Sequence, residues 1–189
     1  CPVSRGATIE CLDGIDIVAK PADGRERLSY LPEEAGAYKS MRGQDYLKFM
    51  AEVFFENPSE QAESIKTAGE ISGLGDRLGD KLGTYSKGMT RKLLLARSIM
   101  TKPKLAILDE PTSGLDVLGA LDIRDTIKVF ARQGMAVLLS SHNMLEIEYL
   151  SDRVAITNKG VLHATGTPTE LKEHFSAQNL EEVFAEVAR

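Results

Sequence analysis

The sequence predicts an α/β fold in which helices flank a mainly parallel β-sheet, and three observations support this prediction. From residue 86 to about residue 157, segments with helical spacing alternate with short apolar runs. Two of these runs, residues 104–108 and 135–141, have the length and apolar content of buried parallel strands. Residues 39–85 show helical spacing and glycine-rich turns instead. Such alternation is typical of helices that connect parallel strands, so we expect one sheet and a small helical insert.

The composition is that of an ordinary globular domain. The chain has 189 residues, of which 42% are hydrophobic and 27% are charged. That length is enough for one domain with a substantial core. The net charge of −5 gives no reason to expect nucleic-acid binding. No apolar run approaches the roughly 18 residues that suggest a transmembrane helix.

The first 31 residues have the character of strands. Apolar side chains stand on both sides of a turn at Asp13-Gly14, as in a hairpin. Residues 28–32 read as a short buried strand that Pro32 ends.

The insert contains two predicted helices followed by a loop. Residues 43–55 have an apolar face, whereas residues 59–72 form a more polar helix and residues 73–86 are punctuated by glycine. The side chains predicted to share the apolar face of the first helix are Tyr46, Phe49, Met50 and Val53.

The remaining elements follow from local signals. A helix over 87–100 ends before Pro103, and a helix over 118–133 ends at Gly134. The later elements are a short helix from Met144, a hairpin with its turn at 158–160, a capping box at 167–170 that opens a helix, and an amphipathic helix over 180–188.

Polar side chains follow two of the predicted strands. Asp109 and Glu110 follow the strand 104–108, and His142 follows the strand 135–141. Ligands of parallel α/β sheets bind at the carboxyl ends of the strands. The sequence therefore predicts a functional site at this end of the sheet.

At these residues the chain resembles the ATPase subunit of ATP-binding cassette (ABC) transporters. Glu110 and His142 stand where that family has its catalytic carboxylate and its switch histidine. The other matching motifs are the signature at 85–89, the Walker B strand at 105–109, the D-loop at 113–116 and the Q-loop region at 31–34. The resemblance implies a P-loop NTPase-like sheet flanked by helices. It also implies a nucleotide-binding core over 1–38 and 86–189 and a helical subdomain over 39–85.

The resemblance implies ATP and Mg²⁺ as the cofactors of an ATPase. Asp109 would hold Mg²⁺, Glu110 would polarise the attacking water, and His142 would contact the γ-phosphate. The alternatives are that the two acids are a polar strand end or a helix cap. Similarly, His142 could cap the following helix or lie in a core hydrogen bond.

The signature motif stands at the start of a predicted helix. Free N–H groups and the helix dipole favour an anion there, so we expect Ser86, Lys87, Gly88 and Met89 to bind ATP held by the opposite subunit, as the resemblance implies. Lys87 replaces the glycine that is usual in the family and adds positive charge. Ser86 could also be an ordinary helix cap.

Two further acids are assigned to the site by the resemblance. Glu33 stands where the family usually has glutamine, and it could bind Mg²⁺, its water or the nucleotide. It could equally be an exposed acid in a loop. Asp116 lies in the D-loop, which crosses the dimer interface in the family, so we expect it to organise the nucleotide interface and to take no part in the chemistry.

The resemblance also implies partners and a location. The expected partners are a transmembrane permease, contacted through residues 33–60, and a second ATPase subunit in a head-to-tail dimer, with no nucleic acid. The expected location is the cytoplasmic face of the cell membrane, as a peripheral subunit. The segments YLPEE, YSKGM and NLEEVF are similar to those of exporter-type ATPases.

One motif of the family is absent from the sequence. The phosphate-binding loop G-x-x-x-x-G-K-[ST], or Walker A, does not occur, and the chain contains no Gly-Lys pair. In the family this loop would fall upstream of Cys1, so we expect the chain to lack the first strands and this loop. Three lost bonds to charged groups, at roughly 1.5–3 kcal/mol each, amount to three to six decades of affinity. We therefore expect the isolated chain not to hydrolyse ATP. The alternative is a non-catalytic cassette that acts as an interaction or regulatory module.

Overall fold

The structure is a computed structural model that describes residues 11–34, 36 and 38–187, and it divides into two compact units. The described part of the first unit spans residues 11–140, and the second unit spans residues 141–187. The strand-like pattern predicted for residues 1–10 lies outside the described residues.

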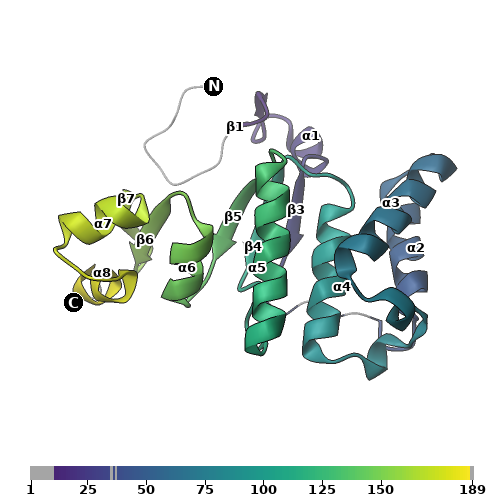
Figure 1. The fold of residues 1–189 in the computed structure, drawn as a ribbon. Coiled ribbons are helices and arrows are strands. Elements are labelled where there is room, and N and C mark those ends of the chain that lie inside the picture. Colours follow the sequence, from purple (N-terminus) through teal and green to yellow (C-terminus); the bar gives the residue numbers. More distant parts are fainter. Residues whose placement is uncertain (1–10, 35, 37, 188–189) are drawn as a thin grey trace. The chain divides into compact units, whose positions relative to one another are not determined.

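The first unit contains the predicted strands and longer helices (Figure 1), and it adds a short helix over residues 21–25 and two 3₁₀ helices in the segment 73–86, for which the sequence predicts a loop. Its elements are β1 (Cys11–Leu12), β2 (Ile15–Asp16), α1 (Pro21–Arg25), β3 (Leu28–Leu31), α2 (Gly43–Phe54), α3 (Pro58–Ser72), the 3₁₀ helices η1 (Gly75–Gly79) and η2 (Leu82–Thr84), α4 (Lys87–Ile99), β4 (Leu105–Asp109), α5 (Val117–Arg132) and β5 (Ala136–Ser140). The hairpin β1–β2 turns at Asp13-Gly14, where φ is 51° and 78°, as the sequence predicts.

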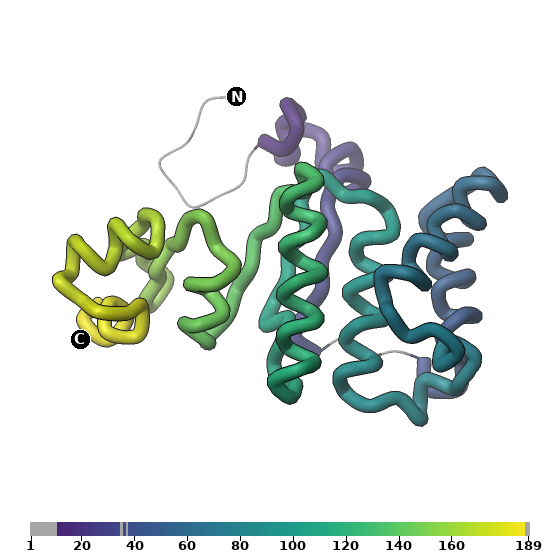
Figure 2. The backbone as a smooth tube through the Cα atoms, viewed as in Figure 1, coloured from purple at the N-terminus to yellow at the C-terminus, as the bar shows by residue number. Residues whose placement is uncertain are grey.

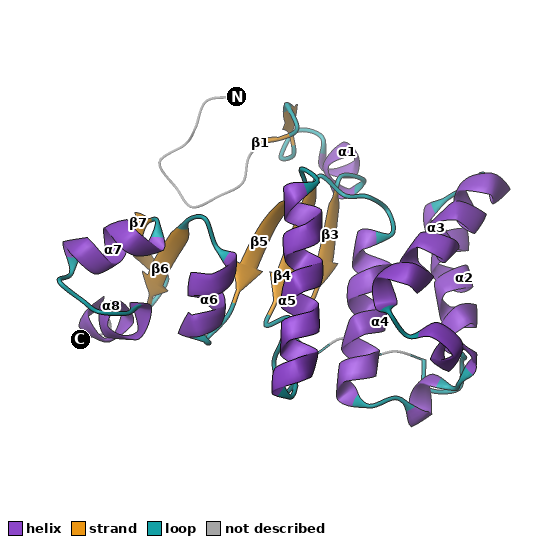
Figure 3. Cartoon of the chain, viewed as in Figure 1, coloured by secondary structure: helices purple, strands orange, loops and turns teal. Residues whose placement is uncertain are grey.

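The centre of the first unit is a three-stranded parallel sheet of order β3-β4-β5. Helix α5 lies over the sheet in Figure 3, and α4 packs beside it against β3. Leu31, Ala106 and Leu108, whose side chains alternate onto the covered face, are fully buried. The predicted α/β class with a parallel sheet is therefore confirmed.

The prediction that β5 is a buried strand is wrong in this structure. Leu138 of β5 is 49% exposed, and so is Tyr30 of β3. Both lie in register with Ile107, on the face that alternates away from α4 and α5. Because α4 and α5 of the first unit lie on the opposite face, the side chains of Tyr30 and Leu138 stay accessible, although Leu105 on the same face is buried.

The insert packs as two helices lying side by side (Figure 2). Asn57 caps α3 by accepting from the N–H of Ser59 at 2.9 Å, and Gly73 ends it in the left-handed conformation. The predicted inner face of α2 is only partly correct: Tyr46 is buried, but Phe49 and Val53 are 40% and 60% exposed. The buried stripe runs instead through Gly43, Tyr46, Leu47 and Ala51.

Helix α4 is the most enclosed helix of the first unit, because it contacts α2, α3, α5 and β3. Its buried side chains are Arg91, Leu93, Leu94, Leu95, Ala96, Ser98 and Ile99. The helix that begins at the signature residues is therefore fixed by packing along most of its length.

The second unit comprises α6 (Met144–Leu150), β6 (Val154–Asn158), β7 (Val161–Gly166), α7 (Pro168–His174) and α8 (Leu180–Val187). Strands β6 and β7 form an antiparallel hairpin that turns at Lys159-Gly160, and Thr167 and Glu170 form the predicted capping box. Its core consists of Ile156, Leu171, Leu180 and Val183. Across the described residues of both units, every helix is too short or too polar to cross a membrane.

Candidate functional site

Asp109 ends β4 at the carboxyl edge of the parallel sheet. Its Oδ1 accepts a 2.5 Å hydrogen bond from the hydroxyl of Ser140, the residue opposite it on β5. The hydroxyl of Tyr30 on β3 lies 3.5 Å from its Oδ2. Hydroxyl groups from both neighbouring strands thus approach the carboxylate, which remains partly accessible.

Glu110 begins the turn that follows the strand. Its φ of 46° lies in the left-handed region, which is unfavourable for a residue with a side chain. The turn is held because the N–H of Glu110 donates to the carbonyl of Ser140 at 2.9 Å, and its own carbonyl accepts from the N–H of Ser113 at 3.1 Å. A strained conformation held by several hydrogen bonds gives this acidic residue a defined position.

Arg91 of α4 binds the same turn, and reasoning from the sequence missed it. Its Nη2 donates to the carbonyls of Asp109 and Glu110 at 2.7 and 2.9 Å. Its Nε donates to the carbonyl of Pro111 at 2.9 Å. The motifs gave no signal for this role, because the acceptors are main-chain atoms that any residue supplies.

Glu33 lies next to this turn. Its Oε1 accepts from the hydroxyl of Ser113 at 3.0 Å, and its carbonyl accepts from Nη1 of Arg91 at 3.2 Å. The residue is exposed, as the loop interpretation requires, yet it contacts the segment that follows Glu110. The structure therefore places Glu33 beside the turn that follows Asp109 and Glu110, at the carboxyl end of the sheet.

Asp109 and Glu33 fit a magnesium ion that takes its other ligands from outside the chain. No group of three or more metal-binding side chains occurs among the residues that the structure describes. Mg²⁺ often binds proteins through one or two carboxylates and takes its other ligands from water and phosphate oxygens. Asp109, with Glu33 on the neighbouring segment, would supply such a partial set of ligands.

Ser86 is the N-cap of α4, where its Oγ accepts from the N–H of Met89 at 3.2 Å. The helix cap considered above is therefore present. A Cβ built on Gly88 would meet only ordinary contacts, with atoms of Leu115 and Ser86 at 3.9 Å. The N-terminus of α4 is the kind of position at which anions bind.

Lys87 lies against the D-loop segment. A Cβ built on Gly114, whose φ is 66°, would lie 2.1 Å from Nζ of Lys87. Asp116, two residues further on, caps α5 by accepting from the N–H of Gly119 at 2.7 Å. The added positive charge of Lys87 is therefore held beside residues 113–116, and Gly114 provides the room for it.

Tyr85 connects the signature segment, residues 85–89, to the insert. Its hydroxyl donates to the carbonyl of Arg77 at 2.7 Å. Burial raises the pKa of Tyr85, the nearby Asp80 carboxylate adds to the rise, and Arg77 opposes it. The phenol is thus held neutral as a hydrogen-bond donor.

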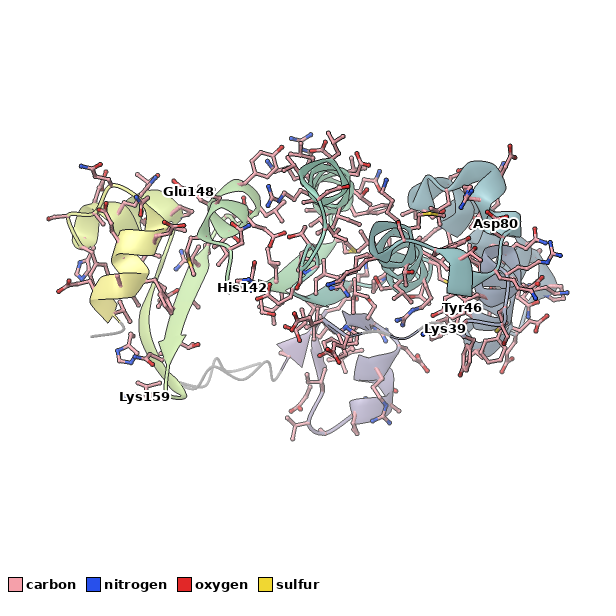
Figure 4. All side chains as sticks on the ribbon, turned by 90° about the horizontal axis from the view of Figure 1, so that it is seen from below. Lys39, Tyr46, Asp80, His142, Glu148 and Lys159 are labelled. Carbon is pink, nitrogen blue, oxygen red and sulfur yellow. The ribbon has the colours of Figure 1, made fainter. Side chains whose placement is uncertain are left out.

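His142 belongs to the second unit, in the loop before α6 (Figure 4). The cap of α6 is Asn143, whose Oδ1 accepts from the N–H of Glu146 at 3.2 Å, so His142 is not the helix cap. On its other side, Ser141 donates to the buried carboxylate of Glu146 at 2.6 Å. These bonds hold the loop on both sides of His142, and its approach to the carboxylates of the first unit stays a prediction.

The chain is similar to several proteins of one family. The sequence pattern of the family described as ABC transporter matches residues 8–113. Linearmycin resistance ATP-binding protein LnrL of Bacillus subtilis (strain 168) is 33% identical over 84% of this chain and 51% of its own length. Fluoroquinolones export ATP-binding protein MT2762 of Mycobacterium tuberculosis (strain CDC 1551 / Oshkosh) is 35% identical over 79% of this chain and 48% of its own length. ABC transporter ATP-binding protein NatA of B. subtilis is 30% identical over 92% of this chain and 71% of its own length.

A solved structure has the same fold. The protein titled "Structure of ATP binding subunit of ABC transporter" superposes with a TM-score of 0.79 and 25% identity over 93% of this chain and 74% of that one. The P-loop NTPase-like fold expected from the sequence is therefore confirmed. The chain spans only about half the length of LnrL and of MT2762, at 51% and 48%.

Proposed function

Because the chain belongs to the ABC transporter family, we propose that it forms part of the ATP-binding and ATP-hydrolysing subunit of an exporter. Two relatives that are 33% and 35% identical over the aligned residues carry names that refer to resistance and to fluoroquinolone export. The observation that carries the proposal is the position of Glu33 beside the turn of Asp109 and Glu110, at the carboxyl end of the sheet.

The residues of the site have different roles in the proposed chemistry. Glu110 orients the attacking water and accepts its proton, and His142 contributes a hydrogen bond to the γ-phosphate. Mg²⁺, held by Asp109 and Glu33 and by the phosphates, would neutralise the charge of the nucleotide. Phosphoryl transfer needs mainly positioning and charge stabilisation, which fixed side chains of this kind can supply.

The signature segment contacts a nucleotide held by a second subunit in this proposal. Ser86, Gly88 and Met89 offer a helix N-terminus, and Lys87 adds a cation beside the D-loop. Asp116 orders the D-loop at the interface. These features support a head-to-tail dimer of two ATPase subunits.

A surface on the insert supports the proposed permease partner. We name it the α2 surface, and it consists of Tyr38, Phe49, Val53 and Phe54, which are 59%, 40%, 60% and 45% exposed. The rings of Tyr38 and Phe49 meet edge to face with centroids 6.1 Å apart. Exposed apolar side chains that gather in this way favour a protein partner. The subunit would then lie at the cytoplasmic face of the membrane, with 39–85 as its helical subdomain and 1–38 and 86–189 as its core.

The 189-residue chain alone is proposed to be inactive. It contains no G-x-x-x-x-G-K-[ST] loop, which supplies backbone donors and a lysine to the phosphates. Turnover by the isolated chain that Glu110→Gln abolishes would overturn this part of the proposal.

The experiment that tests the function measures ATP hydrolysis by the full-length product of the gene. Glu110→Gln keeps the size of the side chain but removes the base, and we expect kcat to fall about 10²- to 10⁴-fold. Glu70→Gln, on the exposed side of α3, is the matched control and should leave kcat unchanged. Absence of hydrolysis by the unaltered full-length protein would favour the non-catalytic module instead.

A further inference from the structure

Arg91 is a buried cation that joins two distant segments of the chain. The residue is 6% exposed. One side of its guanidinium binds the turn at 109–111 through Nε and Nη2. The other side binds the carbonyls of Pro32 and Glu33 through Nη1, at 2.7 and 3.2 Å. The planar fork of arginine can serve several acceptors at once, whereas an ammonium is a single point of charge.

The two segments that Arg91 joins carry the three acids of the proposed site. Glu33 follows β3, Asp109 ends β4, and Glu110 is the first residue after it. The sheet fixes β3 beside β4, with Asp109 still paired to Ser140, and the N–H of Glu110 donates to the carbonyl of Ser140. Beyond these pairs, the hydrogen bonds of Arg91 and the bond from Ser113 to Glu33 join the segment after β3 to the turn after β4.

Arg91 also lies on the helix that begins at the signature segment. Helix α4 is enclosed on most sides, so its N-terminus and Arg91 move together as a rigid element. We propose that Arg91 is a positioning residue that sets the spacing of Glu33, Asp109 and Glu110 and couples it to the N-terminus of α4. This inference rests on the proposed function. Through Arg91, the acids of one subunit would respond to the nucleotide that the signature segment of the same subunit contacts.

The first experiment compares Arg91→Lys, Arg91→Met and the matched control Lys92→Met in the full-length product of the gene. Lys92 is the next residue of α4, but its ammonium binds Asp122 of α5 at 2.6 Å. Both Arg91 variants should lower kcat on the order of 10²-fold, because small displacements of catalytic groups have effects of this size. KM for MgATP should change less than about threefold, since Arg91 binds the protein and no part of the nucleotide. Lys92→Met should leave both constants unchanged.

A second experiment needs no catalysis and uses the 189-residue chain. The amide of Glu110 donates to the carbonyl of Ser140 on β5, and the amide of Ser113 donates to the carbonyl of Glu110, which Arg91 also binds. Arg91→Lys should raise their hydrogen exchange about tenfold or more, since roughly 1.4 kcal/mol of lost protection corresponds to a factor of ten. The amides of α3 should exchange as before, and so should all of these amides in Lys92→Met.

Each outcome bears on the proposal. A wild-type kcat in Arg91→Lys, or unchanged exchange at Glu110 and Ser113, overturns it. Failure of both Arg91 variants to fold also overturns it, because Arg91 would then be a general core residue. If the full-length protein does not hydrolyse ATP while the exchange result holds, the proposed function fails and the positioning by Arg91 stands.

Discussion

Replacing Gly43 by alanine should destabilise the insert, because the new methyl group has no room. A Cβ at this position would lie 2.3 Å from the hydroxyl oxygen of Tyr85 and 3.2 Å from both Cδ2 and the carbonyl oxygen of Leu78. The hydroxyl cannot move aside freely, since it donates at 2.7 Å to the carbonyl of Arg77. Gly43 opens α2, so the clash falls where the insert meets the signature segment.

The size of the effect follows from three terms. Displacing the hydroxyl gives up a hydrogen bond of about 0.5–1.5 kcal/mol, and overpacking costs about 1–3 kcal/mol. Replacing glycine by alanine within a helix stabilises the protein by about 0.5–1 kcal/mol, which offsets part of this loss. We therefore expect Gly43→Ala to lower the free energy of unfolding by about 1–3 kcal/mol. Tyr85→Phe alone should cost about 1 kcal/mol. In the Tyr85→Phe background the main clash is gone, so the two changes should couple by about 1–2 kcal/mol.

The assay is a double-mutant cycle read by urea unfolding in far-UV circular dichroism and by hydrogen exchange of the α2 amides. Gly69→Ala on α3 is the matched control, because its Cβ would lie 3.4 Å from Cδ1 of Leu78, an ordinary contact. It should be neutral or should stabilise by up to about 1 kcal/mol. Additive effects of Gly43→Ala and Tyr85→Phe, or equal effects of Gly43→Ala and Gly69→Ala, would refute the reasoning.

Two further predictions concern pH and the D-loop. Burial raises the pKa of Tyr46, and Arg97 opposes this rise with a smaller effect. The neutral phenol of Tyr46 therefore contributes its full stabilisation below the unfolded-state pKa near 10. This stabilisation is lost as the pH rises through the higher folded-state pKa. Urea unfolding of the 189-residue chain should thus show a loss of stability above about pH 10 that is smaller in Tyr46→Phe, and an unchanged pH dependence in that variant would contradict the assignment. Gly114→Ala should lower the free energy of unfolding by about 1–2 kcal/mol, because alanine is unfavourable in the left-handed conformation, and the new methyl group should displace Lys87. Gly134 has a φ of 97° and open space around it, so Gly134→Ala should have the backbone effect without a clash. In the full-length product of the gene, ATP-dependent dimerisation measured by light scattering should therefore weaken in Gly114→Ala and not in Gly134→Ala.

Local chemistry made much of the fold predictable from the sequence. The turns at Asp13-Gly14 and Lys159-Gly160 and the capping box that begins at Thr167 are set by residues a few positions apart, and each is confirmed. The strand predicted at 104–108 and the helix predicted at 87–100 are confirmed for the same reason, as Leu105–Asp109 and Lys87–Ile99. These signals also located the acids, because a polar pair that ends an apolar strand is visible in the sequence.

The features that could not be predicted depend on contacts between distant segments. The buried stripe of α2 includes small residues such as Gly43 and Ala51, whose burial depends on close packing and not on their hydrophobicity. The exposure of Leu138 depends on which face of the sheet the helices cover. Arg91 has the sequence context of a surface residue on an amphipathic helix, and only the fold shows the carbonyls that it binds.

The signature segment is anchored on both of its flanks, and these anchors explain how distant parts of the first unit can affect it. On the insert side, Tyr85 bonds to Arg77 and fills the space left by Gly43. On the sheet side, Arg91 binds the turn at Glu110. A helix terminus binds an anion well only when its N–H groups keep a fixed direction relative to the rest of the site. In the proposed function, a partner that binds the α2 surface would therefore act on the N-terminus of α4 through Tyr85 and on the acids proposed for hydrolysis through Arg91.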